Sequence, residues 1–291
     1  MFKKRIKLIM VLIAILFIWA VQLQDERTVN TIVKQEGQGL AVHYIDVGQA
    51  DSILVNLPGT LTMLIDAGNN TDEDKVISYL KSQGIERIDI LIGTHPHEDH
   101  IGALDSVIKS FDIGKIYMPK ISHASKTFKD VLLAVQEKDY KVSSPVTGEN
   151  IFEQDSLKLQ FLAPLSTKYE ELNNYSIVTK LTYGDTSFLF TGDAEDVSEK
   201  EMLKAFRGEL KADVLKVGHH GSASSTTTEF LKAVSPAYAL ISVEDQNSYG
   251  HPHKEVIEKL DKSGVKTFRT DKQGTVVMMS DGKQINVITE K

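Results

Sequence analysis

The chain of 291 residues contains no cysteine. It therefore has no disulfide bonds, and any bound metal must be held by histidine, aspartate or glutamate. Positive charge is also scarce, because 33 Lys and Arg against 40 Asp and Glu give a net charge of −7. This balance disfavours a broad basic face for polyanions, although it leaves room for a local groove. The apolar content of 41% is enough for one large globular domain or two small ones.

The N-terminal apolar run, residues 8–21, is shorter than the ~20 residues that a membrane-spanning helix needs. It follows a basic segment, residues 3–7, and this order is typical of a secretory signal rather than of a buried core helix. We therefore interpret residues 1–23 as a signal peptide or N-terminal membrane anchor, 24–36 as a polar tether and 37–291 as the globular domain. We expect an exported protein, either secreted or anchored to the outer face of the cytoplasmic membrane through the uncleaved segment.

The most informative stretch is HPHEDH, residues 95–100, in which three histidines and an aspartate fall within six residues. Residues 88–93 predict a short buried strand and residues 102–111 predict a helix. The cluster is thus predicted on a loop at the C-terminal end of a strand, where open α/β sheets place their sites. Imidazole and carboxylate are ligands for zinc, manganese or iron. The alternative, a histidine-rich surface turn, does not account for this spacing.

Other acidic and histidine side chains adjoin strand-like segments in the same way. For Asp66 we favour an orienting role over direct ligation, and for Asp193 a bridging role over a helix cap. Such residues at the ends of separate strands form the pattern that a binuclear metal site requires. The candidates of this kind are Asp66, Asp193, His219, His220, His251 and His253.

The periodicity of apolar residues predicts alternating strands and helices. His43 lies inside the first strand and is interpreted as a packed or hydrogen-bonded core histidine. Strands are expected at 40–47, 52–57, 61–68, 88–93, 115–118, 141–146, 157–162, 177–183, 187–191 and 213–217, and helices at 73–82, 125–138, 197–206 and 254–263.

Together these stretches resemble the metallo-β-lactamase-fold hydrolases found as the C-terminal domain of ComEC-type DNA-uptake proteins. The matching stretches are residues 46–52, 64–68, 95–102, 173–193, 215–222 and 249–253, which extend from about residue 40 to the C-terminus. The resemblance implies an α/β fold of the four-layer αββα sandwich type. It also implies two divalent metal ions, Zn or Mn, in the groove between the sheets.

The resemblance assigns metal ligands by position. His95, His97 and Asp193 would hold one ion, and Asp99, His100 and Asp193 the other. The second ion also needs a ligand from the pair His219 and His220, and we favour His220.

One departure from the family pattern concerns the first ion. Family members with two full zinc sites carry a further histidine ahead of the bridging aspartate, where this chain has Asn173, Asn174 and Ser176. The first site therefore lacks one imidazole ligand. Manganese, which prefers oxygen ligands, is for this reason a candidate beside zinc.

Two divalent ions lower the pKa of a bridging water and neutralise charge on the scissile group, which suits a phosphodiester. Asp99 is a candidate to orient the hydroxide, and His219 and His251 are candidates to protonate a substrate oxygen. His251 and His253 could instead cap the last helix, and Lys216 could point away from the site. The candidate substrate contacts are Asn174, Ser176, Lys216 and His253, and the candidate supporting residues are Asp51 and Asp66.

We therefore predict an exported metal-dependent hydrolase, namely a phosphodiesterase or nuclease linked to DNA uptake or extracellular DNA. An alternative is a hydrolase of another ester, such as phosphorylcholine on teichoic acid, a lactone or a β-lactam. A non-catalytic, metal-stabilised binding module is the third alternative. A phosphodiester, with DNA as one candidate, is the predicted partner.

Overall fold

The computed structural model describes residues 39–59, 61–154 and 156–291. The predicted signal or anchor (residues 1–23) and the tether (24–36) lie outside the described residues. Among the helices that the structure does describe, none combines the length and the apolar character needed to cross a membrane.

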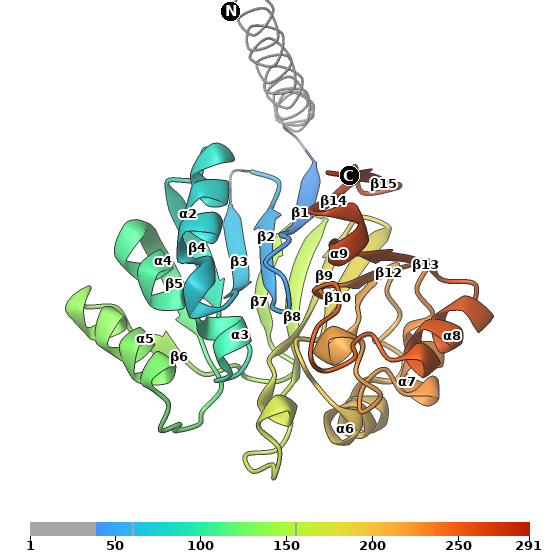
Figure 1. Cartoon of the computed structure of the whole chain (residues 1–291). Coiled ribbons are helices and arrows are strands. Elements are labelled where there is room, and N and C mark those ends of the chain that lie inside the picture. Colours follow the sequence, from blue (N-terminus) through green and yellow to red (C-terminus); the bar gives the residue numbers. More distant parts are fainter. Residues whose placement is uncertain (1–38, 60, 155) are drawn as a thin grey trace, which may run out of the picture. The chain divides into compact units, whose positions relative to one another are not determined.

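Two β-sheets face each other in the centre of the domain (Figure 1). The first has the strand order β15-β14-β1-β2-β3-β4-β5-β6 and the second the order β13-β12-β11-β10-β9-β8-β7. The first sheet consists of β1 (Leu40–Tyr44), β2 (Ser52–Asn56), β3 (Thr62–Ala67), β4 (Arg87–Ile92), β5 (Asp112–Tyr117), β6 (Val142–Ser143), β14 (Val276–Ser280) and β15 (Ile285–Thr289). The second consists of β7 (Asn150–Gln154), β8 (Leu157–Ala163), β9 (Val178–Tyr183), β10 (Thr186–Phe190), β11 (Val214–Lys216), β12 (Tyr238–Ile241) and β13 (Lys266–Arg269).

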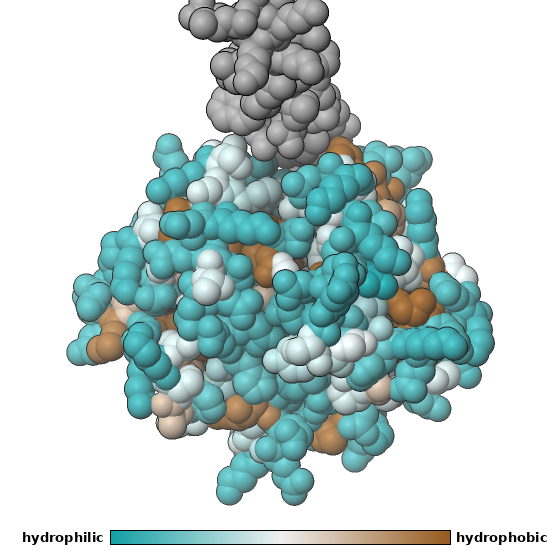
Figure 2. Space-filling model, in the orientation of Figure 1, coloured by the Kyte–Doolittle hydropathy of each residue, from teal (hydrophilic) through white to brown (hydrophobic). Residues whose placement is uncertain are grey.

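Helices cover the outer face of each sheet (Figure 1). The first sheet is covered by α2 (Glu73–Ser82), α4 (Leu104–Ser110) and α5 (Lys126–Glu137), and the second by α6 (Asp196–Phe206), α7 (Thr228–Val234) and α8 (Lys254–Lys262). Three hydrophobic clusters separate the layers, one beneath each helical layer and one between the sheets. The predicted four-layer αββα sandwich is confirmed. Figure 2 shows a mostly hydrophilic face with small, scattered hydrophobic areas, as expected when the apolar side chains are buried in these layers.

Parallel pairing brings the functional loops to the ends of neighbouring strands. In the first sheet β4 pairs in parallel with β3 and β5, and in the second β11 pairs in parallel with β10 and β12. The segments that follow β4, β10 and β11 carry the clustered acidic and histidine side chains.

The structure corrects one local prediction at residues 95–102. Residues 98–101, predicted as part of a loop, form a short helix, α3 (Glu98–Ile101), whereas the helix predicted at 102–111 is present as α4 (Leu104–Ser110). Gly102 separates the two helices because its backbone packs on the loop after β3. Its N–H donates to the Gly68 carbonyl at 2.8 Å, and a Cβ at this position would lie 2.1 Å from the carbonyl carbon of Asn69.

The core interpretation of His43 is confirmed. Its side chain is buried on β1, with Nδ1 2.9 Å from the Tyr79 hydroxyl and Nε2 3.3 Å from the Asn56 amide nitrogen.

Candidate metal centre

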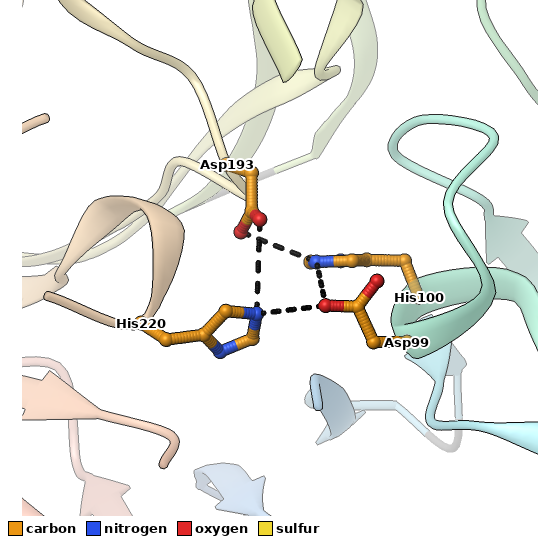
Figure 3. Close-up of side chains that lie close together, drawn as sticks. All are labelled: Asp99, His100, Asp193 and His220. Atoms are coloured by element: carbon orange, nitrogen blue, oxygen red, sulfur yellow. Dashed lines mark hydrogen bonds and ion pairs between the residues drawn. The ribbon is translucent and has the colours of Figure 1, made fainter. Parts of the chain in front are cut away.

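Four side chains from three segments meet between the two sheets (Figure 3). Asp99 and His100 lie on α3, Asp193 follows β10, and His220 belongs to the 3₁₀ turn η3 (Gly218–Gly221) after β11. His219 and His220 both have positive φ, 50° and 52°, a backbone conformation that non-glycine residues rarely adopt. This turn sends the two neighbouring rings in different directions, so that His220 is buried and His219 is partly exposed.

Potential ligand atoms of these four residues all lie within 4.8 Å of one another. The distance from His100 Nε2 to Asp193 Oδ1 is 3.2 Å, and from His220 Nε2 to Asp99 Oδ2 it is 3.3 Å. In the other two histidine–carboxylate pairs, His220 Nε2 lies 3.7 Å from Asp193 Oδ2 and His100 Nε2 lies 3.8 Å from Asp99 Oδ2. Two imidazoles and two carboxylates form a donor set that suits a divalent cation such as zinc or manganese.

The central atoms of this cluster need a further partner. His100 Nε2 and Asp193 Oδ1 are fully buried and face each other at 3.2 Å, but within the part of the chain that the structure describes neither makes a hydrogen bond of normal geometry. Leaving a buried polar atom unsatisfied is costly. A cation bound between these atoms would satisfy both, so the residues fit a metal ion.

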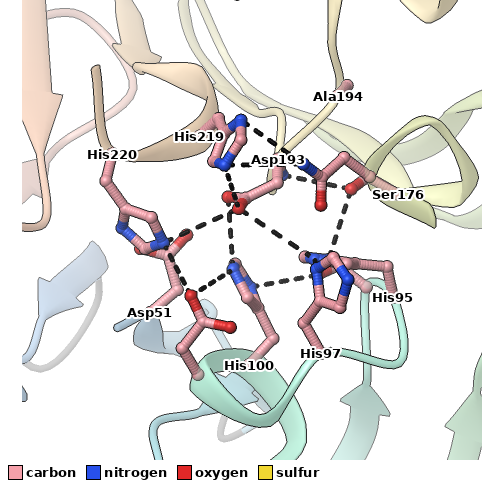
Figure 4. Close-up of polar contacts among 12 residues, drawn as sticks. Asp51, His95, His97, His100, Ser176, Asp193, Ala194, His219 and His220 are labelled. Atoms are coloured by element: carbon pink, nitrogen blue, oxygen red, sulfur yellow. Dashed lines mark hydrogen bonds and ion pairs between the residues drawn. The ribbon is translucent and has the colours of Figure 1, made fainter. Parts of the chain in front are cut away.

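His95 and His97 lie on the other side of Asp193 (Figure 4). His95 Nε2 is 3.0 Å from His97 Nδ1 and 4.0 Å from Asp193 Oδ2. Asp193 is therefore placed between two groups of histidines, as expected for a carboxylate shared by two ions. Asn173, in the region where the sequence lacks a further histidine, is buried, and its side-chain amide nitrogen lies 3.4 Å from the His219 ring.

Asp66 orients His100, which is the role that the sequence favoured over ligation. The Asp66 carboxylate accepts hydrogen bonds of 2.7 Å from the Thr94 N–H and the Thr94 hydroxyl, and it lies 2.7 Å from His100 Nδ1. Because Asp66 engages Nδ1, it leaves His100 Nε2 facing the cluster. The sequence did not single out Thr94, although it directly precedes the motif.

His220 is oriented from behind in a similar way. Its Nδ1 donates to the Ser242 carbonyl at 2.9 Å and lies 3.7 Å from Asp51 Oδ1. Asp51 forms a fully buried ion pair with Lys216, with 2.7 Å between Nζ and Oδ2. Asp51 therefore lies behind His220, in the position of a supporting residue.

The pKa shifts show that the cluster attracts positive charge. Burial opposes protonation of His100, but Asp193, Asp66 and Asp99 raise its pKa well above the usual value. Burial likewise opposes ionisation of Asp193, but His100 and His220 hold its pKa well below the usual value. The carboxylates thus stay ionised and stabilise a positive charge beside them. That charge is either a proton on a histidine or a metal ion, and metal binding requires that the histidines lose their protons.

His219 faces the open side of the cluster. Its side chain is 25% exposed, against 2% for His220. Nε2 lies 3.8 Å from Asp193 Oδ2, and Nδ1 lies 3.2 Å from the Glu195 carboxylate. The hydrogen bond with His219 is the largest cause that lowers the pKa of Glu195. Glu195 was not predicted from the sequence, where its signal was an acidic side chain two residues after the candidate bridging aspartate.

Three of the four predicted substrate contacts have roles inside the protein instead. The side-chain oxygen of Asn174 accepts hydrogen bonds from the N–H groups of Glu195 and Ser198 at the start of α6. The Ser176 hydroxyl accepts a hydrogen bond from the Asp193 N–H. Lys216 is buried and paired with Asp51, so it cannot reach a phosphate at the surface. These three predictions are wrong, because each side chain is committed to an internal partner.

His251 and His253 lie beside the cluster on the loop before α8. The ring of His253 accepts the Ala223 N–H through Nδ1 at 2.9 Å and does not cap α8 with its side chain. Its contact with a substrate stays a prediction. His251 is half-buried, and its Nδ1 lies 3.4 Å from the Gln49 amide. Burial, followed by the neighbouring histidines His219 and His253, lowers the pKa of His251 to about 4, which makes it neutral near pH 7.

Comparison with known proteins agrees with this architecture. Residues 45–244 match the metallo-beta-lactamase superfamily. The chain is 33% identical over 252 residues to ComE operon protein 3 of Bacillus subtilis (strain 168), an alignment that covers 81% of this chain and 32% of that protein. It is 31% identical over 237 residues to competence protein ComA of Neisseria gonorrhoeae, again covering 81% of this chain and 32% of the relative. The chain thus spans about a third of the length of these relatives.

Among solved structures, CmlA, a diiron β-hydroxylase from Streptomyces venezuelae, superimposes with a TM-score of 0.54 at 15% identity. The superposition covers 80% of this chain and 53% of CmlA. At this level of identity the likeness shows the fold alone.

Proposed function

Because the chain belongs to the metallo-β-lactamase superfamily, whose fold binds divalent metal ions, often two, we propose that it is an exported metal-dependent phosphodiesterase that cleaves DNA or a related extracellular phosphodiester. The observation that carries the proposal is the position of Asp193. Its buried carboxylate adjoins His100 and His220 on one side and His95 on the other, with Oδ1 left unsatisfied.

DNA is favoured as the substrate by the names of the relatives. Two proteins that share this domain at 31–33% identity are named for the ComE operon and for competence. The alignments cover only about a third of each relative, so the part held in common is the domain with the metal cluster. A phosphodiester also suits a site with two cations, because its non-bridging oxygens are anionic ligands.

Each residue has a distinct role in the proposed reaction. Asp99, His100, Asp193 and His220 would hold one ion, and His95, His97 and Asp193 the other. When bound, such ions supply Lewis acidity and a nucleophile at neutral pH. His219 is the proposed proton donor to the leaving oxygen, because it is partly exposed, faces Asp193, and has Glu195 to orient its ring and stabilise the imidazolium. His251, whose pKa is about 4, acts as a neutral hydrogen-bonding group.

Export is proposed from the sequence of residues 1–23. The basic residues 3–7 followed by the apolar run at 8–21 support a signal peptide or anchor. An exported enzyme of this kind would meet extracellular phosphodiesters.

The test is a pair of assays on the purified chain, stripped of metal and then refilled with Zn²⁺ or Mn²⁺. The substrates are bis(p-nitrophenyl) phosphate and a single-stranded oligonucleotide, with Asp99→Ala as the inactive control. We expect metal to restore cleavage of both substrates in the wild type and of neither in the variant. Turnover of the small diester alone would indicate a small cell-surface ester, and bound metal without turnover would indicate a binding module.

A further inference from the structure

A groove of about 610 Å³ opens directly beside Asp99. Its walls come from the loop after β1, the loop after β3, α3 and the loop before α8, and Gln49, Glu98, Glu244 and Tyr249 are among its lining residues. Apart from Asp99, none of the residues assigned to metal binding or proton transfer lines this groove. Because one wall is Asp99, a group bound in the groove would be attached to the reacting phosphodiester or adjacent to it.

An exposed aromatic ring stands at the edge of this groove. Tyr249 is 67% exposed, and its ring stacks on His251 with 5.7 Å between centroids and 24° between planes. His251 in turn contacts His219 edge-on at 5.5 Å, and His219 Nε2 lies 3.8 Å from Asp193. A continuous series of rings therefore leads from the groove to the metal cluster.

The loop that carries Tyr249 is held in one conformation by Asn247. The Asn247 side-chain oxygen accepts the N–H groups of Tyr249 and His251, and its amide group donates to the carbonyls of Glu244 and His251. Gln49 attaches the same loop to the first sheet, since its side chain contacts His251 Nδ1 and accepts the Glu244 N–H. The ring of Tyr249 is thus exposed yet preorganised, which is the arrangement of a binding surface.

The charge of the groove selects the group that it binds. Among the described residues that line it, four are carboxylates, namely Asp72, Glu98, Asp99 and Glu244, and Lys75 is the only cation. Such a lining repels a second phosphate, but carboxylates accept hydrogen bonds from the amino groups of bases. A neutral, flat group with N–H donors is therefore preferred over an anionic one.

We propose that this groove binds a nucleobase next to the scissile phosphate, with Tyr249 as its stacking platform. The inference rests on the proposed phosphodiesterase function and deepens it, because it specifies single-stranded nucleic acid as the substrate class. Stacking on an aromatic side chain tolerates every base, since each base has a π-face, and it requires that the base be unpaired.

The experiment compares two substrates of equal charge with the metal-loaded chain: an oligodeoxycytidylate, whose bases carry amino groups, and an abasic oligomer of the same length. We expect the wild type to prefer the oligodeoxycytidylate. Tyr249→Ala should lower kcat/KM on it by about 5- to 150-fold, the range for loss of one stacked base, and so bring the preference close to one. Tyr249→Phe should retain the preference, because the ring is kept. Leu133→Ala, which removes another exposed side chain from α5 outside the groove, should behave as the wild type.

A loss that is equal on both substrates, or no loss on either, would overturn the proposal. Binding of the same labelled oligomers, measured by fluorescence anisotropy, separates it from the proposed function. If the wild type cleaves neither oligomer but binds the oligodeoxycytidylate more tightly in a Tyr249-dependent way, the phosphodiesterase fails and the base site stands. If binding is also insensitive to the bases, the base site is refuted.

Discussion

The buried ion pair between Lys216 and Asp51 allows a sharp test of how the centre is supported. Lys216→Met keeps the apolar stem of the side chain but removes the ammonium group, leaving the Asp51 carboxylate without this partner at 1% exposure. Breaking a buried pair by removing one partner costs about 3–5 kcal/mol. For a domain of this size each kcal/mol lowers Tm by roughly 2–4 °C, so a decrease of about 6–20 °C is expected.

The assay is thermal and urea unfolding of the metal-free protein, so that neither substrate nor metal binding contributes. A double variant, Asp51→Leu with Lys216→Met, removes both charges and should lie within about 1 kcal/mol of the wild type, which gives a large coupling energy in the double-mutant cycle. The matched control is Lys262→Met, whose exposed pair with Glu258 at 3.3 Å should contribute no more than about 1 kcal/mol. A loss below about 1 kcal/mol for Lys216→Met, or additive single variants, would refute the reasoning.

Three further predictions concern single positions. His220→Ala should reduce the metal content measured by atomic emission, whereas His219→Ala should keep the metal and lower kcat; equal metal loss in both would contradict this assignment. Burial lowers the pKa of His43 to about 4, so the folded protein keeps it neutral while the unfolded chain takes up a proton below about pH 6.5. Its stabilising contribution, present above that pH, is therefore lost at roughly 1.4 kcal/mol per pH unit as pH falls toward 4, and His43→Gln should flatten this slope in urea unfolding between pH 7 and 4.5. Gly102→Ala should destabilise the domain by at least about 1–3 kcal/mol and lower its metal content, because the added Cβ would lie 2.1 Å from a backbone atom. The control, Gly208→Ala, should be neutral in the same unfolding assay, because its Cβ would have no heavy atom within 4 Å.

Most of the central strands were predictable because their apolar residues alternate or form short buried runs. The predicted strands at 52–57 and 177–183 correspond to β2 and β9 within a residue at either end. The prediction for 141–146 was less accurate, since only Val142–Ser143 pairs with β5. The strands after residue 235 were not predicted. β14 joins the first sheet beside β1, and a pairing between residues so distant in sequence leaves no local signal.

At the site, the motif identified clustered side chains but not their internal partners. The spacing of His95, His97 and His100 already placed three imidazoles on one turn. The commitment of Lys216 to Asp51 and of Asn174 to the start of α6 depends on which segments pack together. Such partners are fixed by tertiary contacts, so residue type alone made these side chains appear available to a substrate.

The division of the cluster between the two sheets has a consequence for assembly. Asp99 and His100 come from the segment after β4 of the first sheet, whereas Asp193 and His220 follow strands of the second. A bound cation would therefore act as a cross-link between the two halves of the sandwich, and neither half alone carries the complete donor set. Because a ligand that binds only the native state raises stability with the logarithm of its concentration, metal supply would help to hold the sheets together.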